Sequence, residues 1–375
     1  MSQPVYSVKK IEGKSGLKKF IKFPFTVFKG NDCWVPPLNM DEMTVFNEKK
    51  NPAFKHAESA YWMVYKDGEP AGRIAGIVLE SEAKEEQLAR FGWIDFIDDP
   101  KVVELLLNTV EDWAREKGLK GVQGPMGFTD MDFEGLLVEG FDKPGTIATI
   151  YNHAYYPKHL EQYGYEKSID WLQLITEVPD EVPKRLARRA EIIENRFNFK
   201  SLKFKSKKEA QKYGKELFEV LNQSYADLYG FHPLTSDQIQ FYIEQYLGFV
   251  VTDFLSMVVS EEGKLVGFAI TMPSLSKAFQ KARGQILPFG AFHILRAMKK
   301  NDRVDMYLIG VLPEYQKHGV TAIIFRDLIQ AYIDKGIKTT ITNQMLESNQ
   351  KVLAQFNEFN SEVYQRRRCY KKVFA

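Results

Sequence analysis

A strand-to-helix junction in the second half of the sequence carries the residue types of an anion-binding site. Residues 304–311 form an apolar run typical of a strand, and residues 320–336 repeat apolar positions at a helical spacing. The first N–H groups of a helix have no partner inside it, and the helix dipole adds positive charge there. Gly319 lacks the Cβ that would keep a phosphate away, while Lys317 and His318 add donors. The junction therefore predicts a site for a phosphate-bearing ligand.

The matching junction in the first half has the opposite chemistry. Asp98 and Asp99 stand between a predicted strand at 90–97 and a predicted helix at 102–118, and no glycine accompanies them. Two carboxylates would repel a diphosphate at the short distances of a binding site. We therefore expect the second half, and not the first, to bind the phosphate-bearing ligand.

The two halves repeat one order of elements. Residues 61–78 and 256–271 each read as a hairpin, and the turn glycines Gly68 and Gly263 are 195 positions apart. In each half a helix and a strand follow, and a further helix closes toward a last strand. The repeat predicts an α+β fold of two similar domains, each with a mixed, mostly antiparallel sheet and flanking helices. We expect the boundary in the proline-bearing stretch 177–184, which gives domains of residues 1–178 and 179–375.

Composition excludes several classes of protein. The 51 Lys and Arg residues nearly balance the 49 Asp and Glu residues, so the net charge of +2 argues against a nucleic-acid binder. Cys33 and Cys369 cannot form a disulfide framework or a multi-thiolate metal site, and the six histidines include no H-x-x-x-H pair. The N-terminal residues carry lysines where a secretory signal needs an apolar core. We expect a cytoplasmic protein with no metal and no nucleic-acid partner.

The junction resembles the acyl-CoA-binding segment of the GNAT N-acyltransferase superfamily. That segment is a strand followed by Gln/Arg-x-x-Gly-x-Gly/Ala; Gln316 and Gly319 match its first two positions, and Thr321 departs from the third. The resemblance implies acetyl-CoA or a longer acyl-CoA as co-substrate, and a degenerate GNAT copy in residues 1–178. It also implies that a bulge in the preceding strand supplies a main-chain N–H to the oxyanion. The implied co-substrate contacts are Leu308, Ile309, Val311, Gln316, Lys317, His318, Gly319, Val320, Thr321 and Asn349.

The usual proton donor of this superfamily is missing from its usual place. Family members often carry a Tyr seven residues after an Asn; Asn349 is present here, but Phe356 stands at the Tyr position. The remaining side-chain candidates for proton transfer are Glu347, His293 and Tyr364. Each residue also has a purely structural interpretation. Glu347 could be a charge at the start of a helix, His293 part of a packed or solvated face, and Tyr364 a residue of the sheet.

Two segments hint at a lipidic acceptor. Residues 124–150 resemble a segment of bacterial GNAT proteins similar to bacterial ceramide synthases, which implies N-acylation of a sphingoid base. Residues 287–300 mix apolar and basic residues, as in helices that lie on a membrane surface, although we favour a surface helix with its apolar face in the core. The basic run 366–368 could meet anionic groups, and we favour a solvated edge strand.

Three functions fit these features. The first is an acyltransferase that moves an acyl group from acyl-CoA to a primary amine, either a small molecule or a lipid, with peripheral contact to the inner membrane surface. The second is a non-catalytic tandem GNAT module that binds acyl-CoA as a sensor or scaffold. The third is an aminoacyl-tRNA-dependent transferase, which the near-neutral charge and the Gln316–Gly319 spacing disfavour. The sequence leaves the acceptor, the acyl length and the oligomeric state open.

Overall fold

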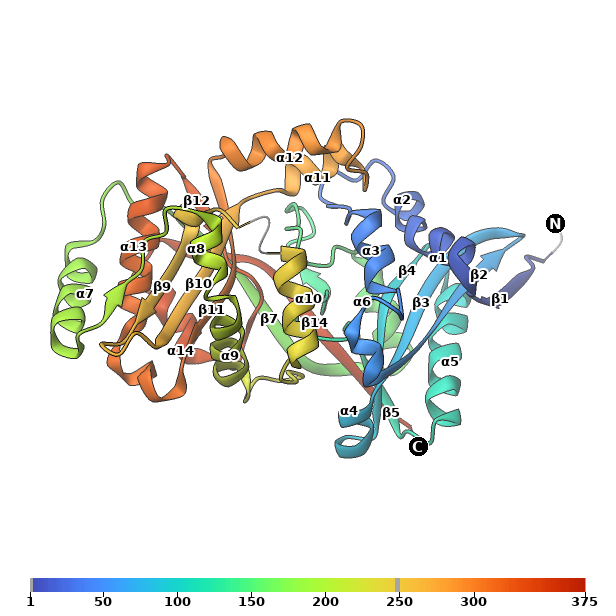
Figure 1. Ribbon diagram of the computed structural model, residues 1–375. Helices are drawn as coiled ribbons and strands as arrows, with labels where there is room; N and C mark the ends of the chain where they lie inside the picture. The colour runs from blue at the N-terminus through green and yellow to red at the C-terminus, as the bar shows by residue number, and fades with distance from the viewer. Residues whose placement is uncertain (1–2, 247–249, 375) are drawn as a thin grey trace. The chain divides into compact units, whose positions relative to one another are not determined.

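A computed structural model describes residues 3–246 and 250–374 and divides into two compact units (Figure 1). Unit 1 contains Met1–Leu172, Ser276–His293 and Gln365–Ala375, and unit 2 contains Gln173–Leu275 and Ile294–Tyr364. Each unit is therefore completed by sequence from the other half of the chain. The domains expected at residues 1–178 and 179–375 stay a prediction, because the compact units are not continuous in sequence.

Unit 1 is built on an antiparallel sheet with one parallel pair. The strand order is β1-β2-β3-β4-β5-β14, and only β4 and β5 run parallel. Helix α5 packs against this sheet and buries Leu106, Leu107 and Val110. The strands are β1 (Tyr6–Lys10), β2 (Ala57–Lys66), β3 (Glu69–Leu79), β4 (Leu88–Phe96), β5 (Gly121–Gly124), β6 (Leu136–Glu139) and β14 (Ser361–Val373). The helices are α1 (Gly13–Lys22), α2 (Pro24–Val27), α3 (Asn39–Val45), α4 (Glu80–Glu85), α5 (Pro100–Glu116), α6 (Tyr155–Gln162) and α11 (Ser276–Ala282), with η1 (Pro52–Lys55).

Unit 2 repeats this plan. Its strand order is β7-β12-β11-β10-β9-β8, and again one neighbouring pair, β11 and β12, is parallel. Helix α13 covers the sheet with Ile323, Ile324 and Leu328. The strands are β7 (Glu166–Glu177, which belongs to this unit from Gln173 on), β8 (Lys200–Ser201), β9 (Leu255–Val259), β10 (Leu265–Pro273), β11 (Arg303–Val311), β12 (Thr339–Ile341) and β13 (Met345–Leu346). The helices are α7 (Lys184–Phe197), α8 (Lys207–Gln211), α9 (Gly214–Tyr225), α10 (Ser236–Tyr246), α13 (Val320–Asp334) and α14 (Gln350–Leu353), with the short turns η3 (Thr252–Phe254), η4 (Pro313–His318) and η5 (Ala354–Phe356).

The two hairpins confirm the predicted duplication. Asp67 and Gly68 turn β2 into β3 with φ of 51° and 84°, the left-handed conformation that tight hairpin turns require. Gly263 has φ of 83° between β9 and β10. The elements after the hairpins also correspond between the units. In unit 1 the helix α5 joins the parallel strands β4 and β5, and in unit 2 the helix α13 joins the parallel strands β11 and β12.

The basic run 366–368 is not at a solvated edge, so that interpretation is wrong. It lies in β14, which pairs with β5 and β6. Arg367 is completely buried and donates to the Ile150 carbonyl over 2.8 Å, and Arg368 donates to Asp170 over 2.8 Å. The charges of this run stabilise the interior of unit 1.

Helix α12 (Gly290–Lys299) follows α11 in the chain. Its residues up to His293 belong to unit 1, and its residues from Ile294 on belong to unit 2. Among the described residues, no helix combines the length and the apolar content needed to cross a bilayer.

Candidate functional site

The predicted phosphate junction is a short turn that delivers the chain into α13. Residues of η4 lead to Gly319, whose φ of 78° places it in the left-handed region at the N-cap of the helix. No side chain caps this end, and the Ala322 N–H already bonds the Gly319 carbonyl over 2.9 Å. The N–H groups of Val320 and Thr321 are thus the first-turn donors open to a ligand.

Gly319 is required here for two local reasons. A side chain would be strained at its positive φ, and an added Cβ would lie 2.7 Å from Cδ1 of Ile193 in α7. The glycine therefore lets α7 approach the start of α13, in addition to leaving space for a phosphate. Replacing it would disturb packing as well as any ligand.

The other side chains of the turn divide into packed and exposed groups. Gln316 donates from Nε2 to the Val311 carbonyl over 3.3 Å, which holds the turn against the end of β11. The His318 ring meets Phe197 edge to face at 4.6 Å, and its buried Nδ1 has no hydrogen-bond partner in the described ranges. Lys317 is exposed, so it is the cation of this turn best able to reach a bound anion.

The equivalent turn of unit 1 is filled by its own carboxylate. Asp99 is the N-cap of α5 and accepts from the Lys101 N–H over 2.9 Å. Its second oxygen accepts from Lys66 Nζ over 2.6 Å and from the Tyr6 hydroxyl over 3.0 Å. The anion position at this helix end is thus occupied from within the chain, in line with the expectation that this turn binds no diphosphate.

Strand β11 carries a bulge, at Tyr307, one residue before the stretch of about Leu308–Val311 to which the resemblance assigned it. Its register with β10 shifts between Ile270 and Thr271, which leaves Tyr307 unmatched, and β12 pairs with β11 only over Arg303–Asp305. The carbonyl of Tyr307 accepts from Asn343 Nδ2 over 3.2 Å, and that of Ile309 accepts from the Tyr225 hydroxyl over 3.1 Å. Since the N–H and C=O of a strand residue point to the same side, the Ile309 N–H faces the side from which β12 has diverged. The Ile309 N–H could therefore donate a hydrogen bond to an oxyanion that forms on this side of β11.

Buried polar atoms without partners gather at the same bulge. Asp305 is 2% exposed, and in the described part of the chain neither of its carboxylate oxygens has a hydrogen bond of good geometry. The Tyr307 hydroxyl and Asn343 Oδ1 are buried and unpaired there too. Buried polar atoms are nearly always paired in proteins, so such a group marks a place prepared for a ligand or for water.

Burial raises the pKa of Asp305 to about 7, against the smaller lowering effects of the Ser274 hydroxyl and the Arg303 charge. Burial, and then the nearby Asp305 charge, raise the pKa of Tyr307 well above its usual value. A carboxyl group that titrates near neutral pH is suited to accept a proton during a reaction. Sequence reasoning missed Asp305; the available signal was a single acid inside an otherwise apolar strand pattern, 304–311.

The proton-transfer candidates from the sequence come from three separate elements. Glu347 is half-buried after β13 in unit 2, and Tyr364 is buried in β14 with the Arg303 guanidinium 5.9 Å from its ring centroid. His293 is half-buried in α12, among the residues of unit 1. Their roles stay predictions.

Within residues 349–356, the first residue caps a helix and the last packs in the core of unit 2. Asn349 is the N-cap of α14, and its Oδ1 accepts from the Val352 N–H over 3.3 Å. Phe356 is 7% exposed and packs edge to face on Phe325, with ring centroids 5.7 Å apart. Phe356 therefore contributes to the core of unit 2 and offers no proton.

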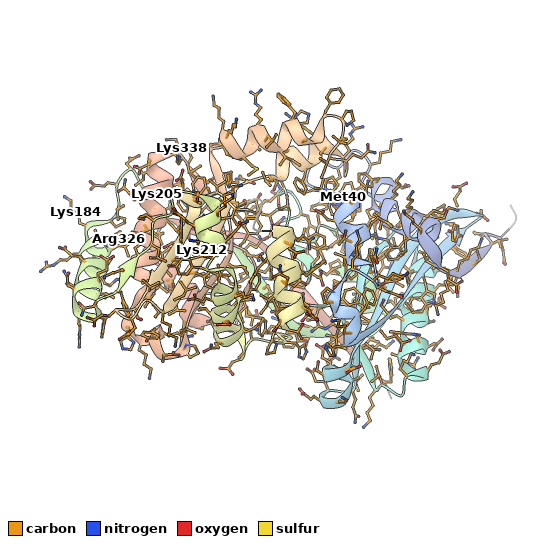
Figure 2. All side chains as sticks on the ribbon, in the orientation of Figure 1. Met40, Lys184, Lys205, Lys212, Arg326 and Lys338 are labelled. Atoms are coloured by element: carbon orange, nitrogen blue, oxygen red, sulfur yellow. The ribbon has the colours of Figure 1, made fainter. Side chains whose placement is uncertain are left out.

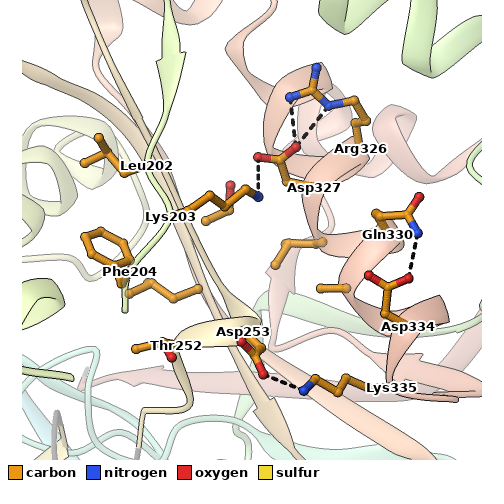
Figure 3. Close-up of a pocket in the computed structure, with 14 residues that line it drawn as sticks. Leu202, Lys203, Phe204, Thr252, Asp253, Arg326, Asp327, Gln330, Asp334 and Lys335 are labelled. Atoms are coloured by element: carbon orange, nitrogen blue, oxygen red, sulfur yellow. Dashed lines mark hydrogen bonds and ion pairs between the residues drawn. The ribbon is translucent and has the colours of Figure 1, made fainter. Parts of the chain in front are cut away.

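A cavity of unit 2 is lined by residues other than those of the α13 turn and the β11 bulge. A groove of about 630 Å³ runs along the C-terminal half of α13, and Figure 3 shows its charged side chains in pairs. Lys203 and Arg326 both contact Asp327, at 3.1 and 2.8 Å, and Lys335 contacts Asp253 at 2.7 Å. Because these cations are already paired, the uncapped N-terminus of α13 is the better place for a diphosphate.

Unit 1 has a small cavity at its own strand bulge, and its mostly apolar lining includes a few charged side chains. The register between β3 and β4 shifts so that Trp93 and Ile94 face the single residue Ile74. The cavity beside it measures about 60 Å³, enough for a few water molecules, and its lining includes Trp93, Glu42 and the ion pair Arg73–Asp95. Burial raises the pKa of Glu42 to about 7, although the Arg73 charge and the Trp93 N–H lower it. The bulge of the duplicated fold is thus polar in both units.

Comparisons with known proteins agree with this architecture. Residues 215–359 match the model of the acetyltransferase (GNAT) family. Protein YghO of Escherichia coli is 28% identical over 96% of this chain and 93% of its own length. The bacterial ceramide synthase of Caulobacter vibrioides is 28% identical over 83% of this chain and 81% of its own. A tandem GNAT protein from the clavulanic acid biosynthesis pathway has the same fold, with a TM-score of 0.56, 11% identity and 98% coverage of both chains.

Proposed function

We propose that this chain transfers an acyl group from acyl-CoA to a primary amine, and the support is its similarity to the acetyltransferase (GNAT) family model over residues 215–359 and to the fold of a tandem GNAT protein. One observation carries the proposal: in unit 2, the uncapped start of α13 follows, after the turn η4, a bulged strand that holds the buried Asp305, whose pKa burial raises to about 7. The first feature suits a diphosphate, and the second suits an ammonium group that must lose a proton.

The co-substrate would be acetyl-CoA or a longer acyl-CoA, held mainly by the main chain. The N–H groups of Val320 and Thr321 would bind the diphosphate, and Lys317 would add positive charge. The main chain of β11 would align the thioester. The complete set of proposed contacts remains Leu308, Ile309, Val311, Gln316, Lys317, His318, Gly319, Val320, Thr321 and Asn349.

The reaction requires the amine to be neutral when it attacks. An alkyl ammonium with a pKa near ~10.4 is ~3.4 units above neutral pH, which corresponds to roughly 4.6 kcal/mol. Asp305 in its ionised form would accept that proton as the C–N bond forms, and the Ile309 N–H would stabilise the oxyanion. The C–S bond then breaks, and the CoA thiolate takes a proton. Glu347, Tyr364 and His293 remain the proposed side chains for that second transfer.

We propose a lipidic amine as the acceptor. The support is the name of one relative, bacterial ceramide synthase, because a ceramide is the amide of a long-chain amino alcohol. Such an acceptor resides in a bilayer, so the enzyme would work in the cytoplasm at the inner membrane surface. A small soluble amine is the alternative acceptor.

A non-catalytic acyl-CoA-binding module is the second candidate. It is favoured by Phe356, which replaces the usual Tyr and packs in the core, and by Asp99, which fills the helix end of unit 1. Acyl-CoA binding is common to both candidates, so only turnover separates them.

The deciding experiment measures release of free CoA thiol from acetyl-CoA and from a long-chain acyl-CoA, with soluble amines and with a sphingoid base. The transferase should release thiol only when an amine is present, and Asp305→Asn should lower kcat by about 10²-fold or more, the usual contribution of a general base. Tight acyl-CoA binding without amine-dependent thiol release in any of these assays would identify the binding module instead.

A further inference from the structure

Large apolar side chains are exposed together on one short segment. Among the described residues, ten large hydrophobic side chains are exposed, and four of them fall within residues 287–295. Leu287 is 75% exposed, Phe289 73%, Phe292 61% and Leu295 58%. The sequence has 27 phenylalanines, yet Phe289 and Phe292 are the only two in that exposed set. Contiguous apolar exposure of this kind marks a surface that meets another apolar phase.

Helix α12 presents two of these side chains, Phe292 and Leu295, on its outer face, and Leu287 and Phe289 lie just before the helix. Gly290 and Ile294, four residues apart, are buried and mark the inner face. At 100° per residue, Phe292, Leu295 and Lys299 fall on the opposite side of the helix. Figure 2 shows side chains projecting outward along α12. The expectation that the apolar face of residues 287–300 packs into the core is therefore wrong for Phe292 and Leu295.

The charge of the segment is entirely positive. Residues 276–300, which we call the α11–α12 segment, contain Lys277, Lys281, Arg283, Arg296, Lys299 and Lys300 and no Asp or Glu. All six basic residues are exposed. The whole chain has a net charge of only +2, so the rest of the sequence is net negative. Positive charge is therefore concentrated where the apolar side chains are exposed.

We infer that the α11–α12 segment docks on the surface of an anionic lipid bilayer. Phe289, Phe292 and Leu295 would enter the boundary between head groups and acyl chains, as the apolar residues of interfacial helices do. Lys299 and its basic neighbours would contact anionic phosphates, and their long side chains can reach the head groups from the edge of the apolar patch. A second copy of the chain would bring the same six cations to the contact and be repelled, whereas an anionic membrane is attracted by every one of them and also accommodates the exposed apolar side chains.

This inference concerns the surface of the protein and does not depend on acyl transfer. The test is flotation of the full-length protein with vesicles of phosphatidylcholine, with and without about 30% phosphatidylglycerol. We expect binding to the anionic vesicles, and at least a tenfold loss of binding when salt rises from about 0.1 M to about 0.5 M. The double variant Phe289→Ser, Phe292→Ser should lower the partition coefficient at least tenfold, and Lys299→Glu with Lys300→Glu should remove the preference for anionic lipid.

Ile192→Ser provides the matched control, because Ile192 is an exposed apolar residue, 54% accessible, on α7 outside the segment. This variant should bind vesicles as the unmodified protein does. The inference is overturned if the unmodified protein does not float, if Phe289→Ser, Phe292→Ser binds equally well, or if that variant instead breaks a dimer in sedimentation. Thiol release from acetyl-CoA with a soluble amine and no vesicles should be unchanged in the double variant. Vesicle binding with no thiol release would preserve the docking surface and reject the proposed transferase.

Discussion

Asp99 and Gly319 hold equivalent positions in the two halves of the chain: each is the N-cap of the helix that joins the parallel strands of its unit. The Asp99 carboxylate accepts from the Lys101 N–H in the first turn of α5, whereas Gly319 leaves the first turn of α13 without a side-chain cap. In the duplicated fold, the N-terminus of α5 is thus capped by a carboxylate of the chain itself, and the N-terminus of α13 has no side-chain cap. This difference supports the proposal that the co-substrate binds unit 2.

Removing the internal anion of unit 1 should affect stability only. Asp99→Ala removes the cap and the contacts with Lys66 and Tyr6, so the free energy of unfolding should fall by about 1–2 kcal/mol. Acyl-CoA affinity should stay within about twofold, because the ligand is proposed to bind α13. Chemical denaturation and calorimetry measure the two quantities. A tenfold change in affinity with an unchanged unfolding free energy would contradict the assignment.

Asp305→Asn should make the protein more stable at alkaline pH while lowering its activity. Burial raises the pKa of Asp305 from 3.8 to about 7, so the folded state holds the proton more tightly than the unfolded state. The resulting cost is absent below pH 3.8, grows as the pH rises toward 7, and is complete above it. The variant should therefore gain roughly 2–4 kcal/mol at pH 8 and almost nothing at pH 4.

Thermal unfolding of the two proteins across this pH range tests that expectation. Glu42→Gln is the matched control in unit 1, because burial also raises the Glu42 pKa to about 7 and a Gln can still accept from Trp93. It should show a similar stability profile with unchanged kcat. Equal stability of Asp305→Asn and the unmodified protein at every pH would show that Asp305 is not held as an uncompensated buried acid.

The buried ion pair of Arg90 and Glu82 should be essential for folding of unit 1. Arg90 Nε donates to both Glu82 oxygens over 2.9 Å, its Nη1 donates to the Gly127 carbonyl, and both side chains are at most 1% exposed. Glu82→Gln leaves a buried guanidinium without its countercharge, so the free energy of unfolding should fall by about 3–5 kcal/mol. The exposed pair Lys101–Glu104 offers the control, since Glu104→Gln should change it by less than about 1 kcal/mol. Similar effects of the two variants in urea denaturation would be inconsistent with this role.

Restoring the missing tyrosine should not restore a proton donor. Phe356→Tyr adds a hydroxyl to the aromatic core of unit 2, near Phe325, and should lower the free energy of unfolding by about 1–3 kcal/mol. Amine-dependent thiol release should rise by no more than about twofold. A tenfold increase in kcat would mean that position 356 faces the reacting thiolate, contrary to its burial here.

The sequence predicted the repeated elements well because local patterns determine them. The hairpin glycines, the apolar periodicity of α5 and α13, and the turn at Gly319 are all visible within a few residues. The chemistry of long-range packing was not visible. That Arg367 is buried depends on β14 joining the sheet of unit 1, and that Asp305 is buried depends on the strands β10 and β12 that flank β11. The exposure of Phe292 could not be predicted either, since helical spacing identifies a face and not its neighbour.

The central claim is that the start of α13 binds the CoA diphosphate, and Thr321→Asp tests it most directly. Thr321 is half-buried at the second position of α13, where a carboxylate is favourable for the helix but repels a bound anion. By calorimetry, acyl-CoA affinity should fall at least tenfold in this variant and stay within about twofold in Thr321→Ser, while the melting temperature of Thr321→Asp holds or rises. Unchanged acyl-CoA affinity in a folded Thr321→Asp protein would contradict the account.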